Sequence, residues 1–492
     1  MAGNIQDDEG VQFPRVAGER STQRTGKAVF AAAARRVDGG LADRIESTSN
    51  WRKGYLAPVR ALTELGTRSA EDASRMAADG LEAVQREFVF ERGGTTNGLE
   101  EAFDTIDSAF TVVTIEGRGR RWNEVVIPYG GRDLRGDELR LQLERWVRTG
   151  TIEPSAAHAV TSVIDHPEWL DLSDVTIAVL GAASEMGPLQ WLSRWGAHVI
   201  AVDLPGKRIW QRVEELVHDG SGKASVPVRE GSNVGAITES AGLDLVRQTP
   251  ELCAWLRPFG PVTLGNYPYA DGATFVRVAV AADALAERLA AEGRLEAYAY
   301  LASPTEVYAV PPQVVERARA GRGTISRVPR TLTGNRVFVP SYSHVMENGR
   351  RGIYDCLVPQ QGANYALAKS LQRWRAVAFK DQGVRVSATV APATRTRSVT
   401  KNRVLAAAYA GAGPFGVEVF EPETSRALTS ALLVRDLRDA TSAADPSARL
   451  DHPYDLFVEG AAHGGLWSLP YEPRTVLPLA VLLGFPRRRA WA

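Results

Sequence analysis

The clearest hydrophobic pattern in the chain is a short run of apolar, largely β-branched residues at 175–180, which predicts a strand buried on both faces. A turn of small residues follows it, and the next segment carries apolar residues at helical spacing: Leu189, Leu192 and Trp195. Residues 198–202 then predict a second buried strand, which ends at Asp203. A strand, a glycine turn, a helix, a strand and an acidic residue in this order predict a mononucleotide-binding βαβ unit.

The same alternation of buried strands and helices continues through the rest of the chain. Further strands are expected at 261–266, 297–302, 384–390 and 454–460, and further helices at 209–217, 273–292, 364–381 and 423–436. Such alternation predicts an α/β fold with a doubly wound parallel sheet of the Rossmann type.

Two regions depart from this pattern. Residues 1–170 read as an N-terminal α+β extension, which we expect to act as a cap, an oligomer contact or part of a substrate wall. Residues 171–492 form the expected Rossmann-type catalytic domain, interrupted at about 304–362 by an insertion with little regular patterning. An insertion of that length is typical of a functional segment or a small subdomain.

Composition and charge narrow the class of protein. The 492 residues carry 58 lysines and arginines against 58 aspartates and glutamates, so no overall charge favours nucleic acid as a partner. The two cysteines lack metal or redox spacing, and the polar N-terminus is no signal peptide, so a cytoplasmic location is expected.

No stretch reaches the length of a transmembrane helix. The apolar segment 476–485 is expected to pack on its own domain, with a membrane surface or a partner subunit as alternatives.

The glycine turn has the chemistry of a diphosphate site. Gly181 permits a sharp turn, and Gly187 permits close packing of helix and strand. Amides at the start of the helix then face the diphosphate. The candidate cofactor contacts in this turn are Gly181, Ala183, Ser184, Glu185, Met186 and Gly187. The Asp203 carboxylate can accept hydrogen bonds from a ribose diol and would repel a 2′-phosphate, so NAD(H) is favoured; Lys207 and Arg208 nearby keep NADP(H) as an alternative.

Tyr365 and Lys369 form the candidate catalytic pair. They stand four residues apart on one predicted helix, so their side chains share a face. A lysine ammonium beside the phenol favours phenolate and brings its pKa toward a working range. Ser303 follows a predicted strand, at the edge where ligands bind in such sheets, and its hydroxyl can contact a substrate oxygen. No metal ligand set is expected.

These motifs resemble those of the short-chain dehydrogenase/reductase family. Residues 180–187, L-G-A-A-S-E-M-G, resemble the family's T-G-x-x-x-G-x-G turn, and Tyr365 with Lys369 resembles its Y-x-x-x-K. Residues 386–392 resemble the strand that ends in Pro-Gly, and 458–465 the closing strand. The resemblance covers about 174–471. It implies Tyr365 as proton donor or acceptor, Lys369 as its activator and Ser303 as the partner of the substrate oxygen.

Several positions depart from the family pattern. Leu180 stands in place of the usual Thr, and Glu185 in place of the middle glycine, where a carboxylate is tolerated if it points to solvent. The spacing from Ser303 to Tyr365 is much longer than in the family, so Ser341 and Ser343 are alternatives for the hydroxyl. Further cofactor contacts are expected from positions that follow predicted strands: Asp244, Asn266, Pro392 and Thr394. For Asp244 the alternative is a turn cap, and for His463 the structural interpretation is favoured over substrate contact.

The sequence thus predicts an NAD(P)(H)-dependent oxidoreductase that interconverts an alcohol and a ketone or aldehyde. The alternatives are an epimerase or dehydratase that retains its cofactor, and a non-catalytic nucleotide-sensing or scaffold protein. The added segments and the apolar C-terminus favour a bulky or lipophilic small-molecule substrate. The resemblance implies a homodimer or tetramer formed through the helices at about 273–292 and 365–381.

Overall fold

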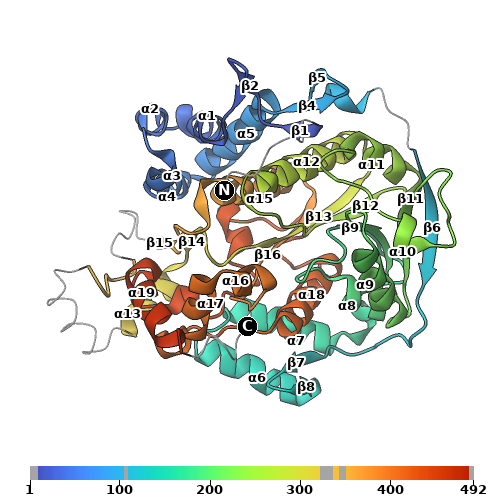
Figure 1. The fold of residues 1–492 in the computed structure, drawn as a ribbon. Helices are drawn as coiled ribbons and strands as arrows, with labels where there is room; N and C mark the ends of the chain where they lie inside the picture. The colour runs from blue at the N-terminus through green and yellow to red at the C-terminus, as the bar shows by residue number, and fades with distance from the viewer. Residues whose placement is uncertain (1–8, 105–108, 322–335, 343–350, 487–492) are drawn as a thin grey trace.

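The computed structural model describes residues 9–104, 109–321, 336–342 and 351–486. Its centre is a seven-stranded sheet in the order β16-β13-β12-β9-β10-β11-β6 (Figure 1). The strands are β6 (Phe110–Glu116), β9 (Thr176–Leu180), β10 (His198–Val202), β11 (Lys223–Arg229), β12 (Val262–Asn266), β13 (Leu295–Ala302) and β16 (Arg385–Val390). Six of them run parallel, and β6 pairs antiparallel with β11 at one edge. The predicted doubly wound, Rossmann-type α/β fold is confirmed.

Alternate residues of the central strands supply two separate hydrophobic cores. Ala178 and Leu180 of β9 belong to one cluster, whereas Ile177 and Val179 belong to the other. Successive side chains of a strand point to opposite faces, so a strand buried on both sides must be apolar at every position. This explains why the central strands read as continuous apolar runs in the sequence.

Helices cover both faces of the sheet. One face carries α12 (Gly272–Ala291) and α15 (Gly362–Asp381), which pack on each other. The other face carries α8 (Leu189–Arg194), α9 (Lys207–His218) and α18 (Pro422–Arg438). Smaller elements between the strands are α10 (Ile237–Ser240), α11 (Thr249–Leu256) and the 3-10 turn η3 (Arg257–Phe259).

The first 170 residues are spread over both faces of this sheet. The helices α1 (Thr22–Arg35), α2 (Gly39–Ser47), α3 (Trp51–Gly54), α4 (Leu56–Gly66) and α5 (Ala70–Glu87) gather on the α12–α15 side (Figure 1). Beside them lie the strands β1 (Gly10–Gln12), β2 (Arg15–Val16), β3 (Glu19–Arg20), β4 (Val89–Arg92) and β5 (Thr95–Gly98), and the 3-10 turn η1 (Glu101–Phe103). On the opposite face lie β7 (Ile127–Tyr129), β8 (Arg132–Leu134), α6 (Gly136–Arg148), α7 (Pro154–Asp165) and η2 (Pro167–Leu170).

Helix α5 packs directly on α15. The α15 residues Leu367 and Leu371 and the α5 residues Ala77 and Val84 are all buried in the same cluster. The resemblance implies that subunits pair through α12 and α15, but in this chain α15 is covered by the chain's own N-terminal helices.

The insertion at 304–362 contains regular structure. Strands β14 (Val307–Val310) and β15 (Gly352–Asp355) pair antiparallel, and α13 (Pro312–Ala320) follows β14. Residues 322–335 and 343–350 of this segment lie outside the described residues, and Ser343 is among them.

The expected strand at 454–460 is wrong, and with it the closing strand at 458–465 that the family resemblance implies. The chain there forms a 3-10 helix, η6 (Pro453–Phe457). His452 accepts a hydrogen bond from the Tyr454 backbone N–H, and the Asp455 carboxylate accepts one from the His452 backbone N–H. These caps, with Pro453 at the first helical position, favour a helical turn over extended chain.

The C-terminal elements pack against one another. They are α16 (Arg397–Lys401), α17 (Arg403–Ala410), η5 (Gly413–Phe415), η7 (Leu466–Ser468) and α19 (Pro473–Gly484). Gly411 and Gly484 let α17 and α19 cross closely, because a Cβ on either would collide with the backbone of the other segment. Segment 476–485 therefore packs on its own domain, with Leu482, Leu483 and Phe485 left exposed. Among the described residues, no helix has both the length and the apolar character to cross a membrane.

Candidate functional site

A large cavity lies at the carboxyl ends of β9, β12, β13 and β16, with a volume of about 1020 Å³. Nine of the residues predicted to bind cofactor or catalyse line it: Ser184, Glu185, Met186, Asn266, Ser303, Tyr365, Lys369, Pro392 and Thr394. Every described residue that lines it lies at position 184 or later in the chain. The carboxyl edge of a parallel sheet is where such folds bind ligands, and the cavity has the size of a cofactor site.

Tyr365 and Ser303 meet in this cavity. Tyr365 lies half-buried in the first turn of α15, and the side chains of Ser303 and Thr305 are close enough to its hydroxyl to influence its pKa. The hydroxyls of Ser303 and Thr305 are themselves 2.9 Å apart, and Gln361 donates to Thr305 at 2.8 Å. The structure thus places a phenol and a serine hydroxyl side by side, although they are far apart in sequence. Ser341, the other described candidate, is not among the lining residues.

The electrostatics of Tyr365 are those of a buried phenol near a carboxylate. Burial raises the pKa of the phenol well above its usual range, and the negative charge of Glu306 raises it further. The neighbouring hydroxyls of Ser303 and Thr305 lower the pKa and offset only part of that rise. The expected lowering of this pKa by Lys369 together with a positively charged nicotinamide stays a prediction for the protein with bound cofactor; without ligand, burial and the charge of Glu306 both raise the pKa.

Lys369 lies one turn further along α15, and its amine contacts the sheet. Nζ donates to the Leu301 carbonyl at 3.1 Å and to Gln372 Oε1 at 2.9 Å. Burial lowers the pKa of the amine, and Glu306 opposes that shift. An ammonium carries three protons, so two fixed acceptors leave one N–H for a ligand in the cavity.

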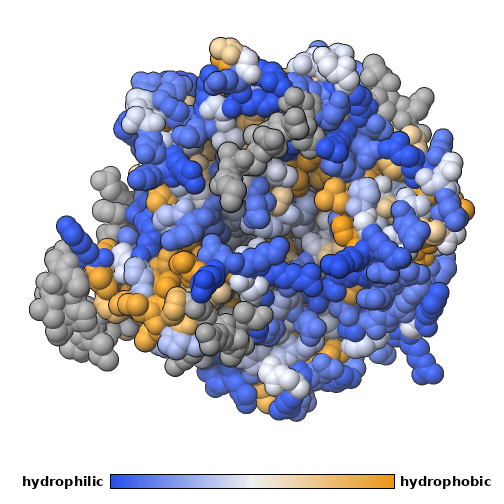
Figure 2. All heavy atoms as spheres, in the orientation of Figure 1, coloured by the Kyte–Doolittle hydropathy of each residue, from blue (hydrophilic) through white to orange (hydrophobic). Residues whose placement is uncertain are grey.

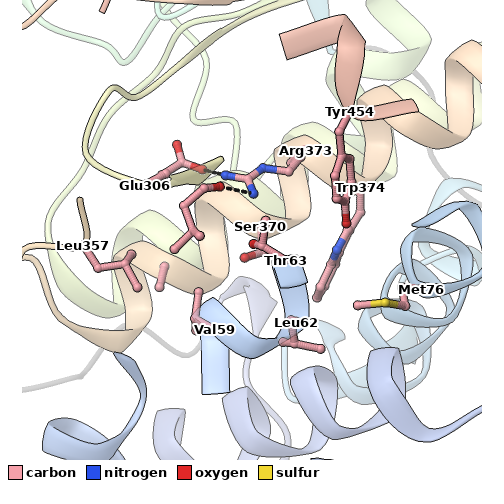
Figure 3. A pocket seen from close by; sticks show the side chains of 12 residues that line it. Val59, Leu62, Thr63, Met76, Glu306, Leu357, Ser370, Arg373, Trp374 and Tyr454 are labelled. Carbon is pink, nitrogen blue, oxygen red and sulfur yellow. Dashed lines mark hydrogen bonds and ion pairs between the residues drawn. The ribbon is translucent and has the colours of Figure 1, made fainter. Parts of the chain in front are cut away.

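Glu306 is a site residue that the sequence interpretation missed. It is 4% exposed, and its carboxylate accepts the Ser303 backbone N–H at 3.0 Å. It also pairs with Arg373, which donates to the Val307 carbonyl at 2.7 Å (Figure 3). The charge of Glu306 bears on both Tyr365 and Lys369. The residue therefore fixes the Ser303 turn and sets part of the field at the site.

Arg373 and Glu306 also line a small cavity between α15 and the N-terminal helices α4 and α5 (Figure 3). Its volume of about 20 Å³ has room for a single water molecule. This small cavity is therefore too small for a cofactor or substrate, whereas the large cavity is not.

The glycine turn has the predicted backbone shape. Gly181 adopts φ +71°, and a Cβ there would lie 2.8 Å from the Pro268 Cα, so only glycine fits. At Gly187 a Cβ would lie 2.7 Å from Ser184 Oγ. The Asp203 carboxylate accepts the backbone N–H groups of Ala183 and Leu204, each at 2.8 Å. Burial raises the pKa of Asp203, whereas these two hydrogen bonds lower it.

Glu185 does not simply point to solvent. Its Oε2 accepts the backbone N–H of Arg397, the first residue of α16, at 2.7 Å. This bond joins the glycine turn to the segment after β16, between the large cavity and a second one of about 540 Å³. Glu185 and Arg397 line both cavities.

Two polar atoms of the large cavity are poised for a ligand. Asn266 donates through Nδ2 to the Tyr298 hydroxyl at 3.0 Å, but its buried Oδ1 has no hydrogen-bond partner among the described residues. The same holds for the buried Ser184 Oγ at the glycine turn. Buried polar atoms are normally satisfied, so these two fit a site that a polar ligand completes.

Pro392 and Thr394 follow β16 and reach the cavity together. Thr394 Oγ1 lies 2.8 Å from the Pro392 carbonyl and 2.7 Å from Ser425 Oγ. Both hydrogen bonds fix the segment that faces the glycine turn.

Two other candidates are structural. Asp244 accepts the Val246 backbone N–H at 2.9 Å and the Arg247 backbone N–H at 3.2 Å, so it caps a turn, and it does not line the large cavity. His463 is fully buried and lies 2.9 Å from Glu153, a pair that ties the C-terminal segment to α7. Within the described ranges, no group of three His, Cys, Asp or Glu side chains could hold a metal ion.

Comparison with known proteins gives a resemblance to solved structures but no match in sequence. No protein-family profile and no curated protein sequence matches the chain. Among solved structures, a 3-oxoacyl-[acyl-carrier protein] reductase from Brucella melitensis in complex with NAD is similar over 60% of this chain and 97% of its own. The sequence identity is 14% and the TM-score 0.31.

Proposed function

We propose that this protein is a nicotinamide-dinucleotide-dependent oxidoreductase that interconverts an alcohol and a ketone or aldehyde. The observation that carries the proposal is the meeting of Tyr365, Lys369 and Ser303 with the glycine-turn residue Ser184 in one cavity. A bound nicotinamide would supply or accept the hydride, which no side chain can do.

In this proposal Tyr365 exchanges a proton with the substrate oxygen. Ser303, which lines the same cavity beside the phenol, holds the same oxygen in place. Lys369 is oriented by Leu301 and Gln372 and turns its remaining N–H toward the ribose of the cofactor. Two hydroxyls that share one oxygen would also polarise a carbonyl before hydride arrives.

The preferred cofactor in this proposal is NAD(H), with NADP(H) as the alternative. Each oxygen of the Asp203 carboxylate accepts one backbone N–H and retains capacity for a ribose hydroxyl. A 2′-phosphate beside that carboxylate would meet like charge.

The proposed substrate carries its carbonyl or alcohol on an apolar body. Away from Tyr365, the large cavity is lined mainly by apolar side chains of α17 and α19, among them Leu405, Ala408, Val476 and Leu477. Apolar side chains also gather on the outer surface over these two helices (Figure 2). Burial of an alkyl chain in such a lobe would contribute about 0.8 kcal/mol per CH₂ group.

A nucleotide-binding protein without turnover is the second candidate. The observation in its favour is the hydrogen bond from Arg397 to Glu185, which places a carboxylate where the family has a glycine close to the diphosphate. That contact must loosen or shift for a dinucleotide to run from one cavity to the other.

A carbonyl screen separates the two candidates. We expect NADH to bind and its absorbance to fall with ketones or aldehydes on apolar chains, with higher kcat/KM as the chain lengthens toward the volume of the lobe. Binding of NADH without turnover on a broad panel would favour the non-catalytic candidate, and failure to bind either nicotinamide nucleotide would contradict both. Nucleotide that co-purifies with the protein would favour the cofactor-retaining epimerase or dehydratase.

The raised pKa of Tyr365 predicts the pH dependence of ketone reduction. Reduction needs the phenol as proton donor, and a raised pKa keeps that form populated from neutral into alkaline solution. We therefore expect kcat/KM for reduction to stay level through neutral pH and to fall only in strongly alkaline solution. Initial rates with saturating NADH would measure this profile, and enzyme returned to neutral pH before assay would control for inactivation. A fall centred near neutral pH would contradict the assignment.

A further inference from the structure

Arg426 is a buried arginine that forms no ion pair with a carboxylate among the described residues. It lies in the first part of α18 and is 5% exposed. Its Nε and Nη1 have no hydrogen-bond partner among the described residues. An isolated buried guanidinium is costly, and buried arginines are normally paired.

This arginine lines the second cavity, of about 540 Å³, beside the glycine turn. Arg212 of α9 and Arg397 of α16 line the same cavity, and Ala183 contributes the turn. Burial and the nearby charge of Arg212 lower the pKa of Arg426. Three arginines from three helices therefore line one opening.

Among the described residues, none of the three carboxylates that line the cavity is hydrogen-bonded to the Arg426 side chain. Glu185 accepts the Arg397 backbone N–H, and Glu421 pairs with Arg395 at 3.1 Å. Glu423 is exposed in the first turn of α18 and, with Glu185, raises the pKa of Arg426 without a hydrogen bond to it. The start of α18, a helix of 17 residues, adds the positive end of its dipole.

The geometry points to a phosphate-binding subsite formed by Arg426, Arg212 and Arg397 against the glycine turn. A phosphate offers several acceptor oxygens to guanidinium groups and satisfies the buried Nε and Nη1. The position of the subsite beside Ala183 favours a phosphate of the dinucleotide as the ligand. This assignment of the ligand rests on the proposed function. A free phosphate or diphosphate has the same chemistry and is the other source.

Titration calorimetry of the full chain tests this subsite with three probes: NADH, inorganic pyrophosphate and adenosine, which lacks phosphate. We expect Arg426→Gln to weaken NADH and pyrophosphate on the order of 10-fold or more and to leave adenosine unchanged. Arg212→Gln, at a half-buried position, is expected to weaken the same two probes by a smaller factor. Arg438→Gln, which removes a charge from the far end of α18, is the matched control.

The outcomes separate this inference from the proposed function. Weakening of pyrophosphate alone would support a subsite for a free phosphate, and weakening of NADH as well would assign it to the cofactor. If the enzyme is active and the Arg426 and Arg212 variants bind NADH and pyrophosphate as tightly as the parent, the subsite is contradicted and the proposed function is not. If the protein binds no NADH but binds pyrophosphate in a way that depends on Arg426, the proposed function is contradicted and the phosphate subsite is supported. Thermal unfolding checks the variants: Arg426→Gln is expected to retain or raise the Tm without ligand and to lose the rise that pyrophosphate gives.

Discussion

Replacement of Tyr365 by phenylalanine is expected to lower kcat for ketone reduction by about 10²- to 10⁴-fold, the range in which a positioned proton donor contributes. The change removes one hydroxyl from a half-buried ring and leaves the packing of α15 against Phe275 intact. Affinity for NADH, measured by the fluorescence of the bound nucleotide, should stay within a few-fold of the parent. Loss of rate with retained binding is the signature of a group that acts in the transition state.

A second phenol in the same cavity provides the control for that experiment. Tyr409 of α17 lines the apolar lobe, and Tyr409→Phe removes an equivalent hydroxyl away from Ser303. We expect this variant to keep its kcat and to change only the KM of apolar substrates. Equal rates for Tyr365→Phe and the parent would contradict the role of the phenol, and equal losses in both variants would assign the effect to the shape of the cavity.

The sequence was sufficient to predict which candidate residues lie together, because each of them follows a strand or lies at the start of a helix. Residues at the carboxyl ends of β9, β12, β13 and β16 must share one edge of a parallel sheet, so Ser184, Asn266, Ser303 and Thr394 meet without further information. The four-residue spacing of Tyr365 and Lys369 places both on one face of α15. Periodicity and topology together determine these positions.

Other features depend on contacts between distant segments, which the pattern does not contain. Strand β11 was not predicted, because Pro227 interrupts its apolar run and proline disfavours a central strand. In the structure β11 lies next to β6, an antiparallel strand from the N-terminal region, with Pro227 opposite Val112. The placement of β6 at this edge could not be read from a segment assigned to a separate extension.

The electrostatics of the site were the least predictable part. Spacing brings Lys369 near Tyr365, but the pKa of the phenol depends on burial and on Glu306, whose carboxylate reaches the site from the inserted segment. The signal that could have identified Glu306 is its place three residues after Ser303, where a carboxylate can bond back to a turn. The second role of Asp203 was likewise not predicted. Its carboxylate, expected to bind the ribose, also accepts the Ala183 backbone N–H and so stabilises the glycine turn.

A buried ion pair beneath this site carries the largest expected effect on stability. Arg375 of α15 donates to both carboxylate oxygens of Asp283 on α12, at 2.6 and 2.9 Å, and also to Glu287 at 2.9 Å. The side chains of Arg375 and Asp283 are only 2% and 3% exposed. This pair anchors α15, the helix that carries Tyr365 and Lys369, to α12.

Asp283→Ala is expected to reduce the free energy of unfolding by about 3–5 kcal/mol, since it strands a buried guanidinium with Glu287 as its remaining partner. Urea denaturation followed by fluorescence would measure the loss. The exposed pair of Arg140 and Asp165 is the control, and Asp165→Ala should leave the free energy of unfolding nearly unchanged. The double variant Asp283→Leu, Arg375→Met should regain much of the loss, because an apolar pair of similar volume carries no desolvation penalty. A double variant as unstable as Asp283→Ala would show instead that the geometry of the ion pair, and not the stranded charge, holds α15 in place.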